Sequence, residues 1–202
     1  TVKDLPNLPN INTILANIGP FRCCSVLDLH SGFFQIPLHP ASQHLTMFRT
    51  PFGLMYYKVM AMGLINSPAS FQRAMEHVFS DLIGNGVYIY IDDILIYGNT
   101  IEEHLHLYEE VLGRCRRYNL WVNGEKSQIG QTQVEYLGHT LNANGIHVKM
   151  DKVQAINDLP DNMASLVHLR HFLGCVNYYA RFIPRCAIIA APLYDLISRY
   201  TN

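Results

Sequence analysis

Val87-Tyr-Ile-Tyr-Ile-Asp92-Asp93-Ile-Leu-Ile-Tyr97 places two adjacent aspartates between two apolar arms. The arms are rich in β-branched and aromatic residues, and a short polar break between two such runs predicts a β-hairpin. Two neighbouring carboxylates repel each other when both are ionised. The alternative is an ordinary solvated turn, because Asp is a good turn residue. The apolar flanks favour the first interpretation: carboxylates neutralised by a cation such as Mg²⁺, which prefers hard oxygen ligands.

A third carboxylate is expected close to this pair. Two metal ions that hold the attacking and leaving oxygens of a phosphoryl transfer need more ligands than one aspartate pair supplies. Asp28 is the candidate, because it lies within the apolar run 24–29, which predicts a buried strand. Considered alone, Asp28 would be a structural residue, and only its partners turn it into a candidate ligand.

The remaining pattern predicts the order of helices and strands. The following elements are expected from apolar spacing, caps and turn residues: a helix at 11–18, strands at 34–38 and 56–60, a helix from Pro68 to Asn85-Gly86, a helix from the Thr100/Glu103 capping box to Tyr118, a hairpin at 134–148, and helices from Asp151, the longest at 164–182. This order predicts an α+β fold with an antiparallel sheet, a helical C-terminal piece and a boundary near residue 149.

Composition limits the class of protein. The 202 residues are 49% hydrophobic, enough for a sizeable core, and no apolar run has the ~18 residues of a membrane span, so no membrane partner is expected. Five cysteines without a CxxC pair predict an intracellular, reducing compartment, cytoplasm and nucleus being indistinguishable. The net charge of −1 lacks the basic excess typical of nucleic-acid-binding proteins. Arg114, Arg116 and Arg117 are either a local basic stripe or cations at a helix C-terminus.

Seven segments, in order, resemble the blocks of a known enzyme family. They are residues 25–36 around Asp28, 46–53, 63–72, 90–96 with the aspartate pair, 123–126, 135–139, and 172–183 with 191–193. Together they resemble the reverse transcriptase of gypsy-type LTR retrotransposons. A lone Asp-Asp turn would be weak evidence, whereas seven ordered blocks are strong.

The resemblance implies a right-hand polymerase core, an RNA-directed DNA polymerase that transfers nucleotides to a primer 3′-hydroxyl by a two-metal mechanism. Its expected parts are the first part of the palm (1–35), partial fingers (36–65), the palm with catalytic hairpin and primer grip (66–148), and a thumb or connection region (149–202). The N-terminal fingers strands and the RNase H domain are expected to be missing. The alternative is a co-opted retroelement fragment that serves as a non-catalytic subunit of an RNA–protein complex.

The resemblance also implies roles for individual residues. Asp28, Asp92 and Asp93 would be catalytic and, with the backbone of Leu29, would hold two Mg²⁺ ions, for which Mn²⁺ can substitute. The other expected contacts are Phe33 as the ring that excludes a 2′-hydroxyl, Gln72 and Lys126 at the nucleotide, and Tyr136, Leu137 and Gly138 as the primer grip. Expected partners are a primer–template of RNA or DNA, dNTPs, and other subunits that complete the fingers or cover the cleft.

Overall fold

The computed structural model describes residues 8–158 and 165–199. The chain divides into two compact units. The first runs to Leu137 and includes Leu141–Ile146, and the second contains Gly138–Thr140 and the chain from His147 onward. Each unit is described by itself below.

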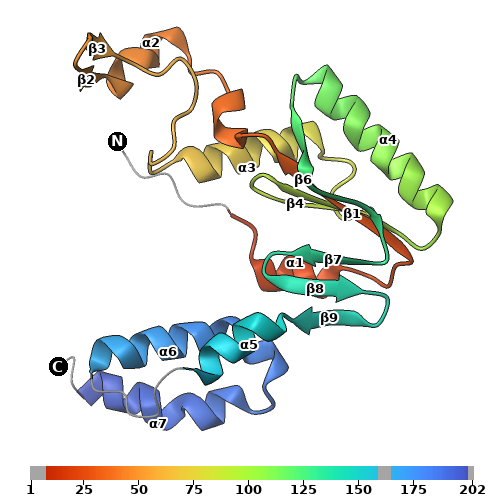
Figure 1. The fold of residues 1–202 in the computed structure, drawn as a ribbon, viewed down its shortest axis with the longest axis vertical. Coiled ribbons are helices and arrows are strands. Elements are labelled where there is room, and N and C mark those ends of the chain that lie inside the picture. Colours follow the sequence, from red (N-terminus) through yellow and green to blue (C-terminus); the bar gives the residue numbers. More distant parts are fainter. Residues whose placement is uncertain (1–7, 159–164, 200–202) are drawn as a thin grey trace. The chain divides into compact units, whose positions relative to one another are not determined.

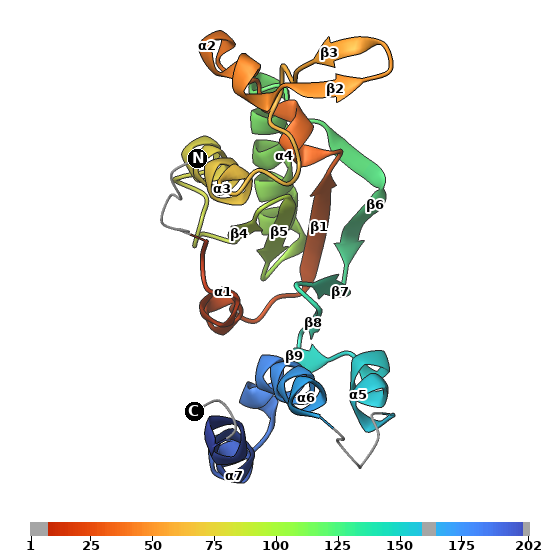
Figure 2. The same ribbon diagram turned by 90° about the vertical axis from the view of Figure 1, so that its left-hand side faces the viewer.

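The first unit is built on a four-stranded sheet in the order β4-β5-β1-β6 (Figures 1 and 2). Every neighbouring pair in it is antiparallel. The strands are β1 (Cys23–Leu29), β4 (Val87–Tyr90), β5 (Asp93–Gly98) and β6 (Val122–Gln131). The strand predicted to contain Asp28 and the predicted hairpin around Asp92 are thus confirmed, and β1 lies between β5 and β6 inside the sheet.

The two faces of this sheet are covered by different elements. Alternate residues of a strand point to opposite faces, so Leu27 and Leu29 of β1 pack in one cluster with helices α3 (Ser67–Val78) and α4 (Ile101–Arg117). Val26 packs in a second cluster with helix α1 (Ile11–Asn17), strand β7 (Gln133–Tyr136) and strand β8 (His139–Asn142). Asp28 belongs to the same alternation as Val26 and therefore faces away from α3 and α4.

Helix α4 begins at the predicted capping box. The Thr100 hydroxyl accepts a hydrogen bond from the Glu103 N–H at 3.1 Å, and the Glu103 carboxylate accepts one from the Thr100 N–H at 3.3 Å. Helix α3, in contrast, ends at Val78, earlier than predicted. The chain then turns through Gly84 and Gly86, whose φ angles of 86° and 85° are left-handed and favour glycine.

Two predicted strands are wrong. Residues 34–38 begin in the 3₁₀-helix η1 (Gly32–Gln35), and residues 56–60 contribute a single bridge, between Pro37 and Val59. Pairing does not extend toward the N-terminus because residues 32–35 are coiled into η1. The residues between these two segments form α2 (Pro40–Gln43), η2 (His44–Thr46) and a hairpin of β2 (Phe48–Thr50) with β3 (Gly53–Met55).

Strand β6 was not predicted, because residues 123–126 have the composition of a polar loop. The predicted strand at 134–141 is two strands, β7 (Gln133–Tyr136) and β8 (His139–Asn142). Leu137 and Gly138 separate them with left-handed φ angles of 47° and 72°. These strands and β9 (Gly145–Val148) form a three-stranded sheet.

The second unit is mainly helical. It contains α5 (Met150–Asn157), α6 (Leu166–Tyr178), the 3₁₀-helix η3 (Ala180–Phe182) and α7 (Cys186–Arg199). The helix predicted over 164–182 corresponds to α6 and η3, and residue 164 lies outside the described residues. Leu169 and Leu173 of α6 pack on Ala190 of α7. Within the described ranges of both units, no helix is long and apolar enough to cross a bilayer. The α+β class with antiparallel sheets is confirmed.

Candidate active site

The backbone brings the three predicted catalytic aspartates to one place. Asp28 of β1 lies directly opposite Asp93 of β5 in the antiparallel register. Side chains at opposed positions point to the same face with Cβ atoms about 5 Å apart. Asp92 joins them, because its carbonyl oxygen accepts the N–H of Leu29 at 3.1 Å. All three aspartates are half-buried.

The carboxylates affect one another electrostatically. Burial, and next the charges of Asp92 and Asp28, together raise the pKa of Asp93 to about 6. Among the described residues, no three His, Cys, Asp or Glu side chains are already gathered closely enough to hold a metal ion. The three carboxylates are therefore close enough to repel one another, but they are not arranged as the ligands of a single metal ion.

The turn that carries Asp92 is held in an uncommon backbone conformation. Ile91 has a φ of 56°, which is a genuine outlier for a β-branched residue. Gln72 of α3 supports it: its Oε1 accepts the Ile91 N–H at 2.7 Å, and its Nε2 donates to the Ile89 carbonyl at 3.3 Å. Gln72 is 1% exposed. Its amide, predicted to contact the nucleotide, is thus engaged with the hairpin backbone in this structure.

Gly32 and two aromatic rings form the wall beside Asp92. A Cβ atom at Gly32 would lie 3.2 Å from the Asp92 Cβ and 3.0 Å from the Phe71 ring. Glycine is therefore required for this close approach. Phe33 is half-buried and packs edge-on against Phe71, with ring centroids 5.4 Å apart. The ring predicted to exclude a 2′-hydroxyl is thus fixed one residue from the glycine that contacts Asp92.

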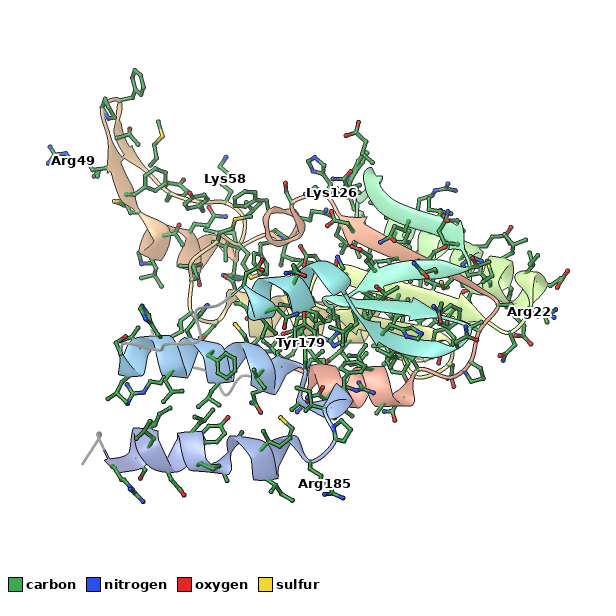
Figure 3. The ribbon with its side chains drawn as sticks, turned by 60° about the horizontal axis from the view of Figure 1, so that its bottom comes forward. Arg22, Arg49, Lys58, Lys126, Tyr179 and Arg185 are labelled. Carbon is green, nitrogen blue, oxygen red and sulfur yellow. The ribbon has the colours of Figure 1, made fainter. Side chains whose placement is uncertain are left out.

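Strand β6 bulges opposite Asp28. Val26 pairs with Gln128 and Asp28 with Asn123, so two steps along β1 correspond to five along β6. Ser127 closes the bulge, since its hydroxyl accepts the Asp28 N–H at 3.2 Å and donates to the Asn123 carbonyl at 2.6 Å. Lys126 lies in the bulge with an exposed side chain (Figure 3).

The predicted primer grip is only partly accessible. Tyr136 is 2% exposed and packs in the cluster that contains Val26 and Leu95. Burial, and next the charge of Asp93, raise the pKa of its hydroxyl, which places this phenol close to the aspartates. Leu137 is half-buried, and the exposed Gly138 begins the second unit. The structure therefore places Tyr136 as a support beneath the hairpin.

A family model described as "Reverse transcriptase (RNA-dependent DNA polymerase)" matches residues 2–141, a span that contains all three aspartates. The chain belongs to the reverse transcriptase family. Members of this family generally use divalent metal ions.

The curated relatives of the chain are retroelement proteins. The Pol polyprotein of the transposon opus of Drosophila melanogaster is 38% identical over 97% of the chain, and that of the transposon gypsy from the same fly is 34% identical over 98%. The chain spans 19% of the length of each of these proteins. Among solved structures, the foamy viral protease-reverse transcriptase in complex with an RNA/DNA hybrid has a TM-score of 0.84 at 27% identity, covering 96% of this chain and 26% of that one.

Three supporting residues had no such role in the sequence-based prediction: Gln72, Ser127 and Gly32. Gln72 and Gly32 lie within the family-like segments, but only packing shows what they contact. Ser127 follows such a segment, and a serine in a polar stretch gives no signal that its hydroxyl ties a bulge to β1.

Proposed function

We propose that the chain is the catalytic core of an RNA-directed DNA polymerase, which adds deoxynucleotides to a primer 3′-hydroxyl along an RNA or DNA template. One observation carries the proposal: Asp28 and Asp93 are register partners beside Asp92, in a chain of the reverse transcriptase family. None of the comparisons favours the alternative of a non-catalytic subunit.

The donor set fits two divalent cations. Carboxylate oxygens are the ligands that Mg²⁺ prefers. The pKa of Asp93 is raised by burial and next by the charges of Asp92 and Asp28, and a bound cation would offset both effects. Asp28, Asp92 and Asp93, with the backbone of Leu29, would hold the ions. Bound Mg²⁺, or Mn²⁺ in its place, would neutralise charge on the attacking and leaving oxygens.

The chain's own residues would prepare the site before substrate binds. The Gln72 amide fixes the Ile91–Asp92 turn, so that the aspartates need little backbone rearrangement during the reaction. This preorganisation lowers the cost of reaching the transition state. The Phe33 ring would lie against the sugar and exclude a 2′-hydroxyl sterically. The exposed Lys126 would place a positive charge near the leaving pyrophosphate.

A primer–template and dNTPs are the proposed partners. The related foamy viral enzyme has been solved with an RNA/DNA hybrid. In this chain, Arg49 of β2 and Lys58 are exposed cations suited to phosphate contact (Figure 3). The same segment exposes Leu45, Phe52 and Leu54 at 76%, 89% and 68%. Exposed apolar groups of this kind mark contact surfaces, which supports the proposal that another subunit completes the fingers.

All five cysteines are free thiols. This supports the proposal that the protein works in a reducing, intracellular compartment.

Primer extension tests the proposal. The 202-residue chain, an RNA template with a DNA primer, dNTPs and Mg²⁺ should give extended primer, and Asp92→Asn should remove it. Glu102→Gln is the control, because Glu102 is an exposed residue in the first turn of α4 and its loss also removes one carboxylate. Absence of extension by the native chain, or equal extension by Asp92→Asn, would overturn the proposal.

A further inference from the structure

Trp121 is the chain's single tryptophan, and its side chain is 66% exposed. Tryptophan is highly buried on average. Its backbone is nonetheless firmly fixed. The Trp121 N–H donates to Gln35 Oε1 at 2.8 Å, and the Trp121 carbonyl accepts the His30 N–H at 2.8 Å and the Gln35 Nε2–H at 3.0 Å. The indole is therefore presented to solvent from a rigid backbone, so little conformational entropy is lost when it contacts a ligand.

The indole lines a hollow of about 360 Å³ together with Arg116, Asn119 and Leu120. Leu120 is buried and supplies an apolar floor. Arg116 comes from the last turn of α4 and has an exposed side chain. Among the described residues it takes part in no ion pair, and its guanidinium is not stacked on a ring. The hollow thus combines an aromatic face, an apolar floor and an available cation.

The arginine cluster at the end of α4 divides into different roles. Arg114 is a structural residue: its guanidinium donates to both carboxylate oxygens of Asp81 and to the Val78 carbonyl. Arg116 lines the hollow, whereas Arg117 is exposed and does not line it. Arg114 therefore serves the fold at the C-terminal residue of α3, whereas Arg116 is available for contact with a ligand.

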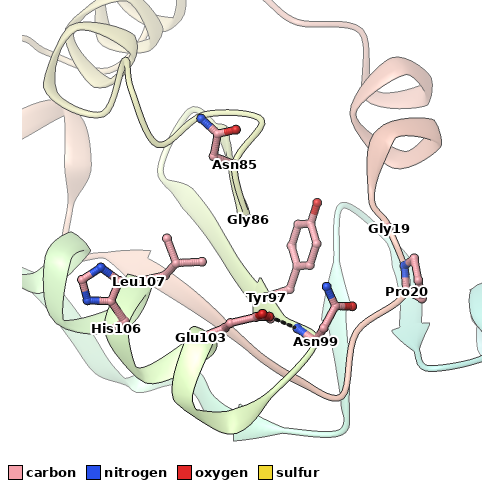
Figure 4. Close-up of a pocket in the computed structure, with 10 residues that line it drawn as sticks. Gly19, Pro20, Asn85, Gly86, Tyr97, Asn99, Glu103, His106 and Leu107 are labelled. Atoms are coloured by element: carbon pink, nitrogen blue, oxygen red, sulfur yellow. Dashed lines mark hydrogen bonds between the residues drawn. The ribbon is translucent and has the colours of Figure 1, made fainter.

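A second hollow, of about 430 Å³, makes a useful comparison (Figure 4). Its acidic side chain, Glu103, accepts the Asn99 N–H at 2.9 Å and caps α4. Its charged group is thus already used by the fold, unlike Arg116.

We propose that the Trp121–Arg116 hollow binds one unpaired nucleotide of a single-stranded nucleic acid, with the base stacked on the indole and a phosphate on the guanidinium. Aromatic faces beside cations are what single strands bind, because their bases expose the π-faces that a duplex hides. Val122, which also lines the hollow, pairs with Leu29, so the hollow lies beside the end of β1, on the α4 side of the sheet and opposite the face that carries Asp28. The inference rests on the proposed function, in that a nucleic acid is the expected partner.

Trp121 fluorescence reports this site alone, because the chain has no other tryptophan. Single-stranded rA₁₀ added to the 202-residue chain should quench it saturably. Arg116→Gln should raise the dissociation constant about five- to thirtyfold, as expected for one partly exposed charged contact. Arg117→Gln removes the same charge one position along, and it should change the constant less than about twofold. Trp121→Leu, followed by anisotropy of labelled rA₁₀, should also weaken binding.

Several results would overturn the proposal. They are absence of quenching by rA₁₀, equal effects of Arg116→Gln and Arg117→Gln, equal quenching by a blunt duplex, and AMP binding as tightly as rA₁₀, which would point to a free nucleotide. An indole already shielded from acrylamide would show the hollow to be covered by protein and would overturn it too. Failure here is distinguishable from failure of the proposed function: Asp92→Asn should abolish extension and leave the quenching intact.

Discussion

Replacing Gln72 by Met should damage the active site through the backbone of its hairpin. The substitution keeps the volume of this 1% exposed side chain but leaves the Ile91 N–H and the Ile89 carbonyl without their partner. An unsatisfied buried group costs about 1–3 kcal/mol. Because the Ile89 contact is long, at 3.3 Å, and a carbonyl tolerates a lost bond better than an N–H, the expected loss of unfolding free energy is about 2–4 kcal/mol.

The same change should lower kcat more than it changes KM for dNTP. Without Gln72, Ile91 is free to leave its left-handed conformation at φ 56°, and Asp92 moves with it. If the free energy of the observed turn conformation rises by about 1.4–2.8 kcal/mol relative to its alternatives, kcat falls about ten- to a hundredfold. Urea unfolding and steady-state primer extension measure the two effects, with the exposed α3 residue substitution His77→Gln as control.

A free energy of unfolding of Gln72→Met within about 0.5 kcal/mol of the native value would refute the support role of Gln72, because changes of that size are ordinary for surface substitutions. A rise in KM at unchanged kcat would instead favour a direct nucleotide contact by Gln72.

Three further outcomes are expected. In metal-free buffer, Asp93→Asn should stabilise the chain at pH 7 by about 1–2 kcal/mol after discounting for partial exposure, because the pKa of Asp93 in the folded chain, about 6, lies above the ordinary 3.8. For the same reason, the free energy of unfolding of the native chain should fall as the pH rises from about 4 to 6. A free energy of unfolding that does not change over this pH range in urea melts would contradict the prediction. Gly32→Ala should cost about 1–3 kcal/mol of stability and reduce extension by crowding Asp92 and Phe71, whereas Gly19→Ala, with open space around its Cβ, should do neither in thermal melts and extension assays. Phe33→Val should lower the preference for dNTP over rNTP, measured as the ratio of kcat/KM values, by at least about tenfold, and an unchanged ratio would remove Phe33 from sugar selection.

The strands that carry the three aspartates were predictable because local signals and packing agree there. The apolar arms around Asp92 and the run that contains Asp28 are strong patterns, and both form the predicted strands. The N-terminus of α4 was equally predictable, because the capping box depends only on Thr100 and Glu103. In these cases the residues that specify the element lie within the element itself.

The errors arise where distant residues decide the structure. Strand β6 has no alternating pattern, and it exists because β1 offers it a partner. Residues 34–38 have the composition of a strand, but the segment begins in η1 and pairs only through the bridge of Pro37 with Val59. The support role of Gln72 was likewise not predicted, because its hydrogen bonds to Ile89 and Ile91 depend on how α3 packs on the sheet; its predicted contact with the nucleotide stays a prediction.

Binding of Mn²⁺ tests the central claim most directly, since Mn²⁺ substitutes for Mg²⁺ and its free form is measured by electron paramagnetic resonance. The native chain should bind Mn²⁺ in competition with Mg²⁺, and Asp28→Asn and Asp92→Asn should each remove at least half of the bound ion, while Glu102→Gln retains it. Equal Mn²⁺ binding by the native chain and Asp92→Asn would show that the three neighbouring aspartates are not a metal site.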